Sequence, residues 1–281
     1  MSSFWLALRS GFGFLSMLPV GLTMEGIAAL MEKNYLYPVI GTFLGILLGV
    51  IAYISQLILP GEIALIIMLF SIYYIVGFNH LDGVADLGDG MMAHGSLEKK
   101  LNALKDTKLG IGGAASCTIL LISLYSSIAA VQTESLSFVR MFNGSPEITT
   151  PLMMFLSFIV METCAKHSML TIATFGKSIH EGLGSMTIDG ATPVNFMIGT
   201  IFSGLICTAT LGLAGLLALI ASIIFSLVLL NRSNNHFGGL NGDGIGTANE
   251  LGRIISLATI ALTISFMIKT DNLVGLRWML L

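Results

Sequence analysis

Three aspartates stand close together in an otherwise apolar part of the sequence. Asp82, Asp86 and Asp89 are spaced i, i+4 and i+7, so a helix would carry all three on one stripe. Carboxylates held so close repel one another where the dielectric constant is low, unless a cation lies among them or they keep their protons. Because no cluster of histidines or cysteines accompanies them, and oxygen ligands favour hard cations, the spacing predicts a site for Mg²⁺ or Mn²⁺.

A solvated acidic face is the alternative interpretation of this segment. The residues between the aspartates are Gly, Val, Ala and Leu, however, and not the Glu and Lys of an ordinary exposed helix. An EF-hand is excluded, because Val84 would occupy its third position and no glutamate stands at the twelfth. An apolar run directly precedes the aspartates, which places them where a helix leaves the bilayer. Acidic residues at such a place indicate a functional site.

Five other polar residues lie near the aspartates in sequence. Lys105 and Lys108 flank Asp106 and would bind phosphate as point charges or anchor the next helix on the positive side of the membrane. We expect Asp106 to begin that helix and to face the three aspartates, either as a fourth metal ligand or as the general base. His80 and His94 bracket the aspartates, as substrate contacts or as ordinary polar residues at a helix end.

The composition identifies the elements that must position these residues as membrane helices. Of 281 residues, 54% are hydrophobic and 10% are charged, against about 25% charged in a typical soluble domain. So few charges cannot cover a soluble protein of this size. The apolar runs are continuous, which excludes a porin-like barrel, and all three cysteines lie inside them, which excludes a disulfide framework. The net charge of −3 excludes a nucleic-acid binder that works through bulk positive charge.

The apolar runs predict an all-α, polytopic integral membrane bundle of about seven transmembrane helices in a single domain, residues 1–281. A spanning helix needs about 20 mostly apolar residues. The run at 194–230 is too long for one span, so we divide it near Gly212–Gly215. The N-terminal segment, residues 4–22, is interrupted by Arg9 and Pro19 and is predicted to be an interfacial or re-entrant helix, with an eighth span as the alternative. The other predicted spans are residues 35–59, 63–78, 111–131, 151–175 and 248–268.

The distribution of basic residues predicts the orientation in the membrane. With the N-terminus in the cytoplasm, eight lysines and arginines fall in cytoplasmic loops and three fall outside. The same orientation places every polar, glycine-rich loop on the cytoplasmic side. We therefore expect a multi-pass protein of the cell membrane with its active-site loops in the cytoplasm.

Two further groups of residues have open interpretations. Glu162, Lys166 and His167 lie in the middle of a predicted span, where Glu162 and Lys166 would form an internal ion pair or line a substrate cavity. The segment 236–252 contains six glycines and is predicted to be a loop. It would either let backbone N–H groups approach phosphate or serve as a flexible re-entrant turn.

The acidic segment resembles the motif of the membrane CDP-alcohol phosphotransferases. The string DLGDGMMA at residues 86–93, with Asp106 downstream, follows the order of that motif in part. In that family, aspartates at the mouth of a helix bundle hold a divalent metal ion against a nucleotide pyrophosphate. His94 stands where the family has an arginine, and Gly110 stands where it has its last aspartate.

A longer resemblance is to the cobalamin synthase family, adenosylcobinamide-GDP ribazoletransferase. HLDGVADLGDG at residues 80–90 and LNALKDTKLG at residues 101–110 are similar to its most specific strings, with Lys108 where arginine is common. Met17 and Asn241 replace an arginine and a threonine of the family pattern. The further matching strings are FLSMLPV at 14–20, YPVIG at 37–41, EGLG at 181–184, GGLNGD at 238–243 and NE at 249–250.

This resemblance implies a reaction in the last stage of cobalamin biosynthesis. α-Ribazole, or its 5′-phosphate, would attack the corrinoid-linked phosphoryl group of adenosylcobinamide-GDP and release GMP. The metal ligands and catalytic residues would be Asp82, Asp86, Asp89 and Asp106, with Mg²⁺ or Mn²⁺ as the ion. The substrate-binding residues would be His80, Gly90, Lys105, Lys108, Asn241, Asp243 and Glu250.

Three other functions compete with this one. A lipid-headgroup CDP-alcohol phosphotransferase is the nearest in chemistry. A secondary transporter would place its charges near the membrane midplane and show an internal repeat, and we find no repeat. A structural scaffold would give no reason for three stacked aspartates. We expect the lipid bilayer and the two substrates as partners, no nucleic acid, and room for a homo-oligomer.

Overall fold

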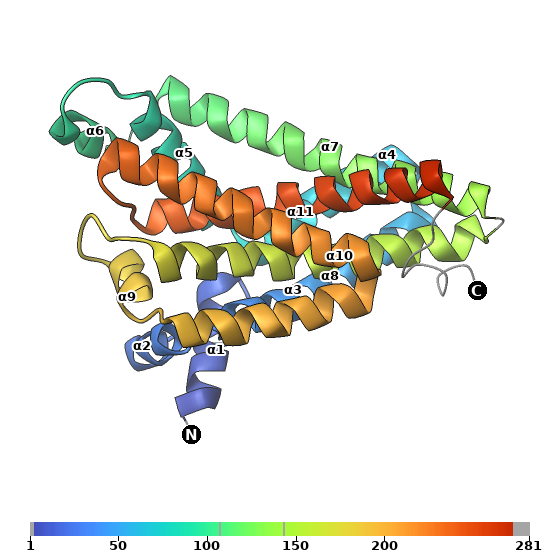
Figure 1. The fold of residues 1–281 in the computed structure, drawn as a ribbon, viewed down its shortest axis with the longest axis horizontal. Coiled ribbons are helices and arrows are strands. Elements are labelled where there is room, and N and C mark those ends of the chain that lie inside the picture. The colour runs from blue at the N-terminus through green and yellow to red at the C-terminus, as the bar shows by residue number, and fades with distance from the viewer. Residues whose placement is uncertain (1–2, 107, 143, 272–281) are drawn as a thin grey trace.

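The structure is a computed structural model that describes residues 3–106, 108–142 and 144–271. Every regular element in these ranges is a helix, and the helices form an elongated bundle (Figure 1). Their bounds are α1 Ser3–Leu15, α2 Met24–Glu32, α3 Leu36–Ile58, α4 Gly61–Val76, α5 Asn79–Met92, α6 Leu97–Leu104, α7 Ile111–Met141, α8 Pro146–Phe175, α9 Leu183–Asp189, α10 Pro193–Phe237 and α11 Gly242–Thr270.

The predicted polytopic membrane bundle is confirmed. Among the described residues, α3, α7, α8, α10 and α11 are each long and apolar enough to cross a membrane, and the bent pair of α4 and α5 is a sixth candidate. α10 has 45 residues, about 68 Å if straight, which is more than twice the hydrocarbon thickness. It breaks at Leu211 and Gly212, where Gly212 has φ +55°, and its second half runs back toward the end of the bundle at which the first half began (Figure 1). The predicted division of this run is therefore correct, and counting both halves gives the seven spans.

α8 is the central helix of the bundle. Its apolar segment is 83% buried by the other helices, so α8 needs no polar face. α3 packs closely against it through Gly41, Gly45 and Gly49, which recur at every fourth residue. A Cβ atom at any of the three would lie 2.5–2.7 Å from a backbone atom of α8. Small residues at this spacing allow two membrane helices to approach closely.

The short helices gather at one end of the bundle. α2, α5, α6 and α9 lie at the left of Figure 1, where the connections from α8 to α9 and from α10 to α11 also lie. α1 has 13 residues, about 20 Å, which is too short to cross a hydrocarbon core of about 30 Å. It packs on α2 and α3. The structure thus agrees with an interfacial or re-entrant N-terminal helix and not with an eighth span.

The predicted glycine-rich loop at residues 236–252 is mostly wrong. α11 begins at Gly242, capped by Asn241, whose Oδ1 accepts the Gly244 N–H at 3.3 Å. Two glycines of α11 serve helix packing. A Cβ atom on Gly246 would lie 3.2 Å from the Cα atom of His80, and one on Gly252 would lie 2.9 Å from the Cα atom of Ala165. Only residues 238–241 connect α10 to α11.

Candidate active site

The three aspartates lie on one helix, as predicted, and that helix lies across the end of the bundle. α4 ends at Val76, Gly77 adopts φ +87°, and α5 runs at 94° to α4. α5 therefore continues α4 at nearly a right angle and does not run along the direction in which α4 would cross the membrane. Close contacts fix it in place, because a Cβ atom on Gly83 would lie 2.9 Å from the Cα atom of Asp243 and one on Gly88 would lie 2.5 Å from Ser116 Oγ.

The carboxylates on α5 are close enough to perturb one another. Asp82 is exposed, and Asp86 and Asp89 are half-buried. Partial burial, together with the negative charges of Asp243, Asp82 and Asp89, raises the pKa of Asp86 from 3.8 to about 6. Asp243, at the start of α11, thus belongs to the same cluster although it lies more than 150 residues away in the sequence. The cluster carries an excess of negative charge that a divalent cation would neutralise.

Asp89 has a second role that the sequence analysis missed. Its Oδ2 accepts the Gly110 N–H at 2.7 Å and its Oδ1 accepts the Gly113 N–H at 2.9 Å. These two donors are the free N–H groups at the start of α7, so Asp89 caps that helix from a neighbouring one. The signal was present in the sequence: α7 starts after Gly110, with no Ser, Thr, Asp or Asn there to cap it.

Asp106 is not where we predicted it. α7 begins at Ile111, so Asp106 lies in the loop between α6 and α7, exposed to solvent, and its Oδ1 accepts the Lys108 N–H at 3.1 Å. The physical reason is that the helix start is set by the Asp89 cap at Gly110. Lys105, at the end of α6, and Lys108 are exposed in the same region. A metal-ligand role for Asp106 would require this loop to approach α5.

The remaining predicted site residues differ in their surroundings. Asn241 and Asp243 lie beside the acidic cluster, and the Asn241 side-chain amide donates to Asp243 Oδ2. Gly90 is buried against Phe237, and its carbonyl oxygen accepts a hydrogen bond from His236 Nε2 at 3.1 Å. His80 is half-buried on α5, where Gly246 packs against its backbone, and His94 is exposed after α5 ends.

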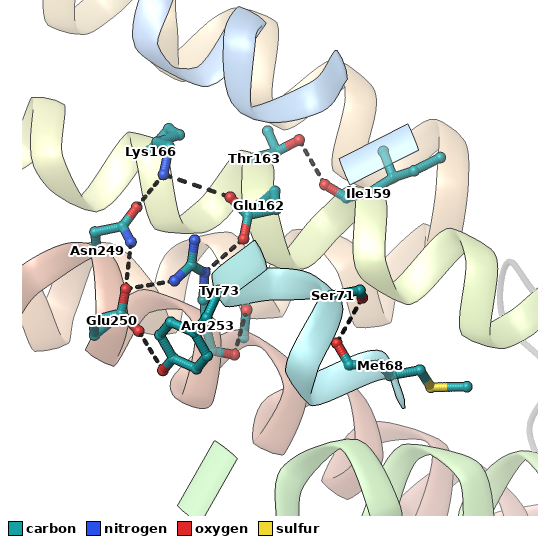
Figure 2. Close-up of polar contacts among 11 residues, drawn as sticks. Met68, Ser71, Tyr73, Ile159, Glu162, Thr163, Lys166, Asn249, Glu250 and Arg253 are labelled. Carbon is teal, nitrogen blue, oxygen red and sulfur yellow. Dashed lines mark hydrogen bonds and ion pairs between the residues drawn. The ribbon is translucent and has the colours of Figure 1, made fainter. Parts of the chain in front are cut away.

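Glu250 lies in a buried polar network with side chains of α4, α8 and α11 (Figure 2). Its Oε2 accepts the Tyr73 hydroxyl at 3.0 Å, and its Oε1 accepts Asn249 Nδ2 at 3.0 Å and Arg253 Nη1. Its carboxylate is thus fully engaged by α4 and α11 side chains and is 0% exposed. The structure therefore places Glu250 inside the bundle, with both carboxylate oxygens engaged by side-chain donors, and its expected substrate contact stays a prediction.

The same network decides between the two interpretations of the charges in α8. Lys166 Nζ lies 3.5 Å from Glu162 Oε2, which confirms the internal ion pair. Arg253 Nε donates to Glu162 Oε1 at 2.5 Å, and Lys166 Nζ donates to Asn249 Oδ1 at 2.6 Å. Two carboxylates and two cations therefore balance within a site that excludes water, as buried charges require.

The acidic cluster has the oxygen donors that a hard cation prefers. Its carboxylates, however, do not surround a single point at which an ion could bind. No three His, Cys, Asp or Glu side chains among the described residues converge closely enough to hold a metal ion. Asp82 and Asp86 nevertheless offer carboxylate oxygens within the electrostatic cluster that also contains Asp243. Asp89 keeps free lone pairs, because a carboxylate can accept about four hydrogen bonds and it accepts two from α7. Side-chain rotations would be needed to bring these carboxylates around one ion.

A bundle of apolar helices whose acidic residues meet at one end has the architecture of a multi-pass membrane enzyme. A family model described as "Cobalamin-5-phosphate synthase" matches residues 7–261. The chain belongs to this family, whose curated members are transferases that act on phosphate groups.

Three similar curated proteins match the chain over 99–100% of its length. Adenosylcobinamide-GDP ribazoletransferase of Methanosarcina mazei is 53% identical over 100% of both chains, and that of Methanosarcina barkeri is 50% identical over 100% of both. The protein of the same name from Methanococcoides burtonii is 45% identical over 99% of both chains. No solved structure matches.

Proposed function

We propose that the protein is an adenosylcobinamide-GDP ribazoletransferase of the cell membrane. The observation that carries this proposal is the identity of 45–53%, along the whole chain, with three curated relatives of that name. The resemblance of residues 80–90 and 101–110 to the family's specific strings supports it, since those residues form α5 and its surroundings at the polar end of the bundle. The orientation with that end in the cytoplasm rests on the bias of basic residues.

In this proposal the carboxylates of the acidic cluster bind the cation, and the turn at Gly77 and the Asp89 cap hold α5 in position. Asp82 and Asp86, with a lone pair of Asp89, would hold Mg²⁺ or Mn²⁺, and the bound ion would neutralise the pyrophosphate of the donor. The turn at Gly77 aims these carboxylates across the bundle end, and the Asp89 cap ties them to α7. Lys105 and Lys108 are exposed near the adjacent loop and would attract the anionic donor from the cytoplasm.

The proposed reaction needs alignment more than covalent help from the protein. A hydroxyl oxygen of α-ribazole, or of its 5′-phosphate, forms a bond to the corrinoid-linked phosphorus. The bond from that phosphorus to the oxygen of GMP breaks, and GMP leaves with the electron pair. The hydroxyl proton passes to water at this solvent-exposed end. The products are adenosylcobalamin or its phosphate, and GMP.

A direct assay tests the proposal. Purified protein in detergent is mixed with adenosylcobinamide-GDP, α-ribazole and Mg²⁺, and GMP is followed by chromatography. We expect GMP to appear only when both substrates and a divalent cation are present. Substituting α-ribazole 5′-phosphate identifies the preferred acceptor. Absence of GMP with every acceptor and with either metal would contradict the proposal.

A lipid-headgroup phosphotransferase remains the second candidate because of one observation. A strongly apolar groove of about 630 Å³ lies beside α5, between α7 and α11, and its lining includes Leu87, Ile119 and Ile254. Such a groove would accept the acyl chain of a lipid donor. Release of CMP from CDP-diacylglycerol under the same conditions would favour this candidate over the first.

A further inference from the structure

A separate polar cavity of about 250 Å³ lies where two loops meet at the same end of the bundle. One loop joins α8 to α9, and the other joins α10 to α11. Backbone hydrogen bonds tie them together, from the Leu240 N–H to Lys177 O at 2.9 Å and from the Ile179 N–H to Leu240 O at 3.1 Å. At the far side of the cavity a Cβ atom on Gly184 would lie 2.4 Å from Gly242 N. The cavity is thus enclosed by two segments that hold each other in place.

The lining of this cavity suits a neutral ligand that donates hydrogen bonds. Its polar side chains are those of His180, Ser185, Asn241 and Asp243, and its described lining contains no lysine or arginine. A phosphate group would meet the Asp243 carboxylate with no cation in the lining to offset the repulsion. A hydroxyl group would instead donate to that carboxylate, which accepts one hydrogen bond from Asn241 and has capacity for more. His180 lies near enough to interact electrostatically with Asp243.

The position of the cavity limits which part of a substrate it can receive. α5 touches its wall, since a Cβ atom on Gly83 would lie 2.9 Å from the Cα atom of Asp243. An attacking hydroxyl must lie about 3–3.5 Å from the phosphorus that the aspartates of α5 hold in place. The base of a nucleotide donor is farther away, because a ribose and a phosphate separate it from that phosphorus. A ribose that carries the attacking hydroxyl therefore fits this place better than a donor base.

We infer that this cavity binds the ribose of the acceptor nucleoside, with Asp243 and His180 as hydrogen-bond partners of its hydroxyl groups. The inference rests on the proposed function and adds the place where the acceptor binds. It also adds two residues, His180 and Gly242, that the sequence analysis did not single out. The ribose of the nucleotide donor also carries hydroxyl groups, and the test distinguishes binding of the donor ribose from binding of the acceptor ribose.

The test fills the cavity without disturbing the fold. Gly242 is the first residue of α11, lines the cavity, and would have no atom within 4 Å of an added Cβ, so Gly242→Leu extends into open space. Gly204 of α10 is equally unhindered and lies far along the bundle, so Gly204→Leu is the matched control. Asp243→Asn removes the negative charge of the proposed hydrogen-bond acceptor, and His180→Gln replaces the imidazole ring, while both nearly preserve side-chain size.

Two measurements decide the inference. Equilibrium dialysis with α-ribazole alone should show binding weakened ~10-fold or more by Gly242→Leu, because the added side chain fills the cavity. Asp243→Asn should weaken it by a similar factor, because a hydrogen bond to a charged group is replaced by one to a neutral amide. In steady-state assays the KM for α-ribazole should rise by a similar factor while the KM for adenosylcobinamide-GDP stays within about 2-fold, and Gly204→Leu should match the unmodified protein in both.

The results also separate this inference from the proposed function. An unchanged affinity for α-ribazole, or a rise in the donor KM instead, would overturn the inference even if the unmodified protein releases GMP normally. Failure of the unmodified protein to release GMP would count against the proposed function. In that case the dialysis measurement still decides whether this cavity takes the nucleoside.

Discussion

Asp86→Asn should stabilise the metal-free protein at neutral pH while abolishing most of its activity. The folded protein raises the pKa of Asp86 from 3.8 to about 6, first by partial burial and then through Asp243, Asp82 and Asp89. At 1.36 kcal/mol for each pH unit, this difference corresponds to about 3 kcal/mol. Solvent screening at a half-exposed position reduces it, and we expect a gain of roughly 1 kcal/mol in the free energy of unfolding.

The sign of the effect follows from proton linkage. Between pH of about 4 and 6 the folded protein binds the Asp86 proton more tightly than the unfolded chain does. The contribution of Asp86 to stability therefore falls as the pH rises through this window, and it stays unfavourable above pH 6. Below about pH 4 both states are protonated, so the difference between Asp86→Asn and the unmodified protein should disappear.

The assay is chemical unfolding in detergent, followed by circular dichroism, at several pH values with EDTA. Asp189→Asn is the control, because Asp189 is exposed at the end of α9 and away from α5. Added Mg²⁺ should then stabilise the unmodified protein more than Asp86→Asn, since only the former keeps the full set of ligands. A variant that is less stable at pH 7 without metal, or equally stabilised at pH 4, would refute the reasoning.

Three further predictions follow from the contacts described above. Asp89→Asn should lower the free energy of unfolding by ~1–2 kcal/mol, opposite in sign to Asp86→Asn, because one of the two α7 N–H groups would face an amide NH₂; the same unfolding assay checks this. Arg253→Met should destabilise the protein by ~3–5 kcal/mol, because it leaves the carboxylates of Glu162 and Glu250 buried with one cation. The double variant Arg253→Met with Glu250→Gln should recover part of this loss. Equal stability of the single and the double variant would contradict the charge argument. In a background without Cys117, Cys164 and Cys207, a cysteine at Ser96 or Asn241 should react with impermeant reagents only from the cytoplasmic side and one at Ser145 only from outside; labelling of positions 96 and 241 from opposite sides would contradict the single-face arrangement.

The sequence predicted the spanning helices well because apolar length alone determines them. The expected span at residues 35–59 is α3, Leu36–Ile58, and the expected break in the longest run lies at Leu211–Gly212. Helix ends that depend on tertiary contacts were missed. The first turns of α11, with Gly244 and Gly246, have low helix propensity and were predicted to be a loop, yet close packing on α5 keeps them helical.

The site was predictable in its residue types but not in its assembly. The stripe of Asp82, Asp86 and Asp89 follows from helical periodicity, which is a local property. The approach of Asp243 to α5, the Asp89 cap on α7 and the burial of Glu250 all depend on how distant helices pack. No spacing rule contains that information. The 94° turn at Gly77 was likewise invisible, because a glycine at the end of an apolar run predicts only that the helix stops there.

The pairing of charges inside α8 and α11 bears on how the chain enters the bilayer. Glu162 and Lys166 are partners within α8, and Glu250 and Arg253 are partners within α11. Each helix can therefore leave the insertion machinery with its charges already neutralised, before the other helix has been synthesised. When the two helices meet in the membrane, Arg253 gains Glu162 and Lys166 gains Asn249. These new contacts between α8 and α11 favour one position of α11 along α8. Membrane insertion would therefore favour the same position of α11 that brings Asp243 to α5.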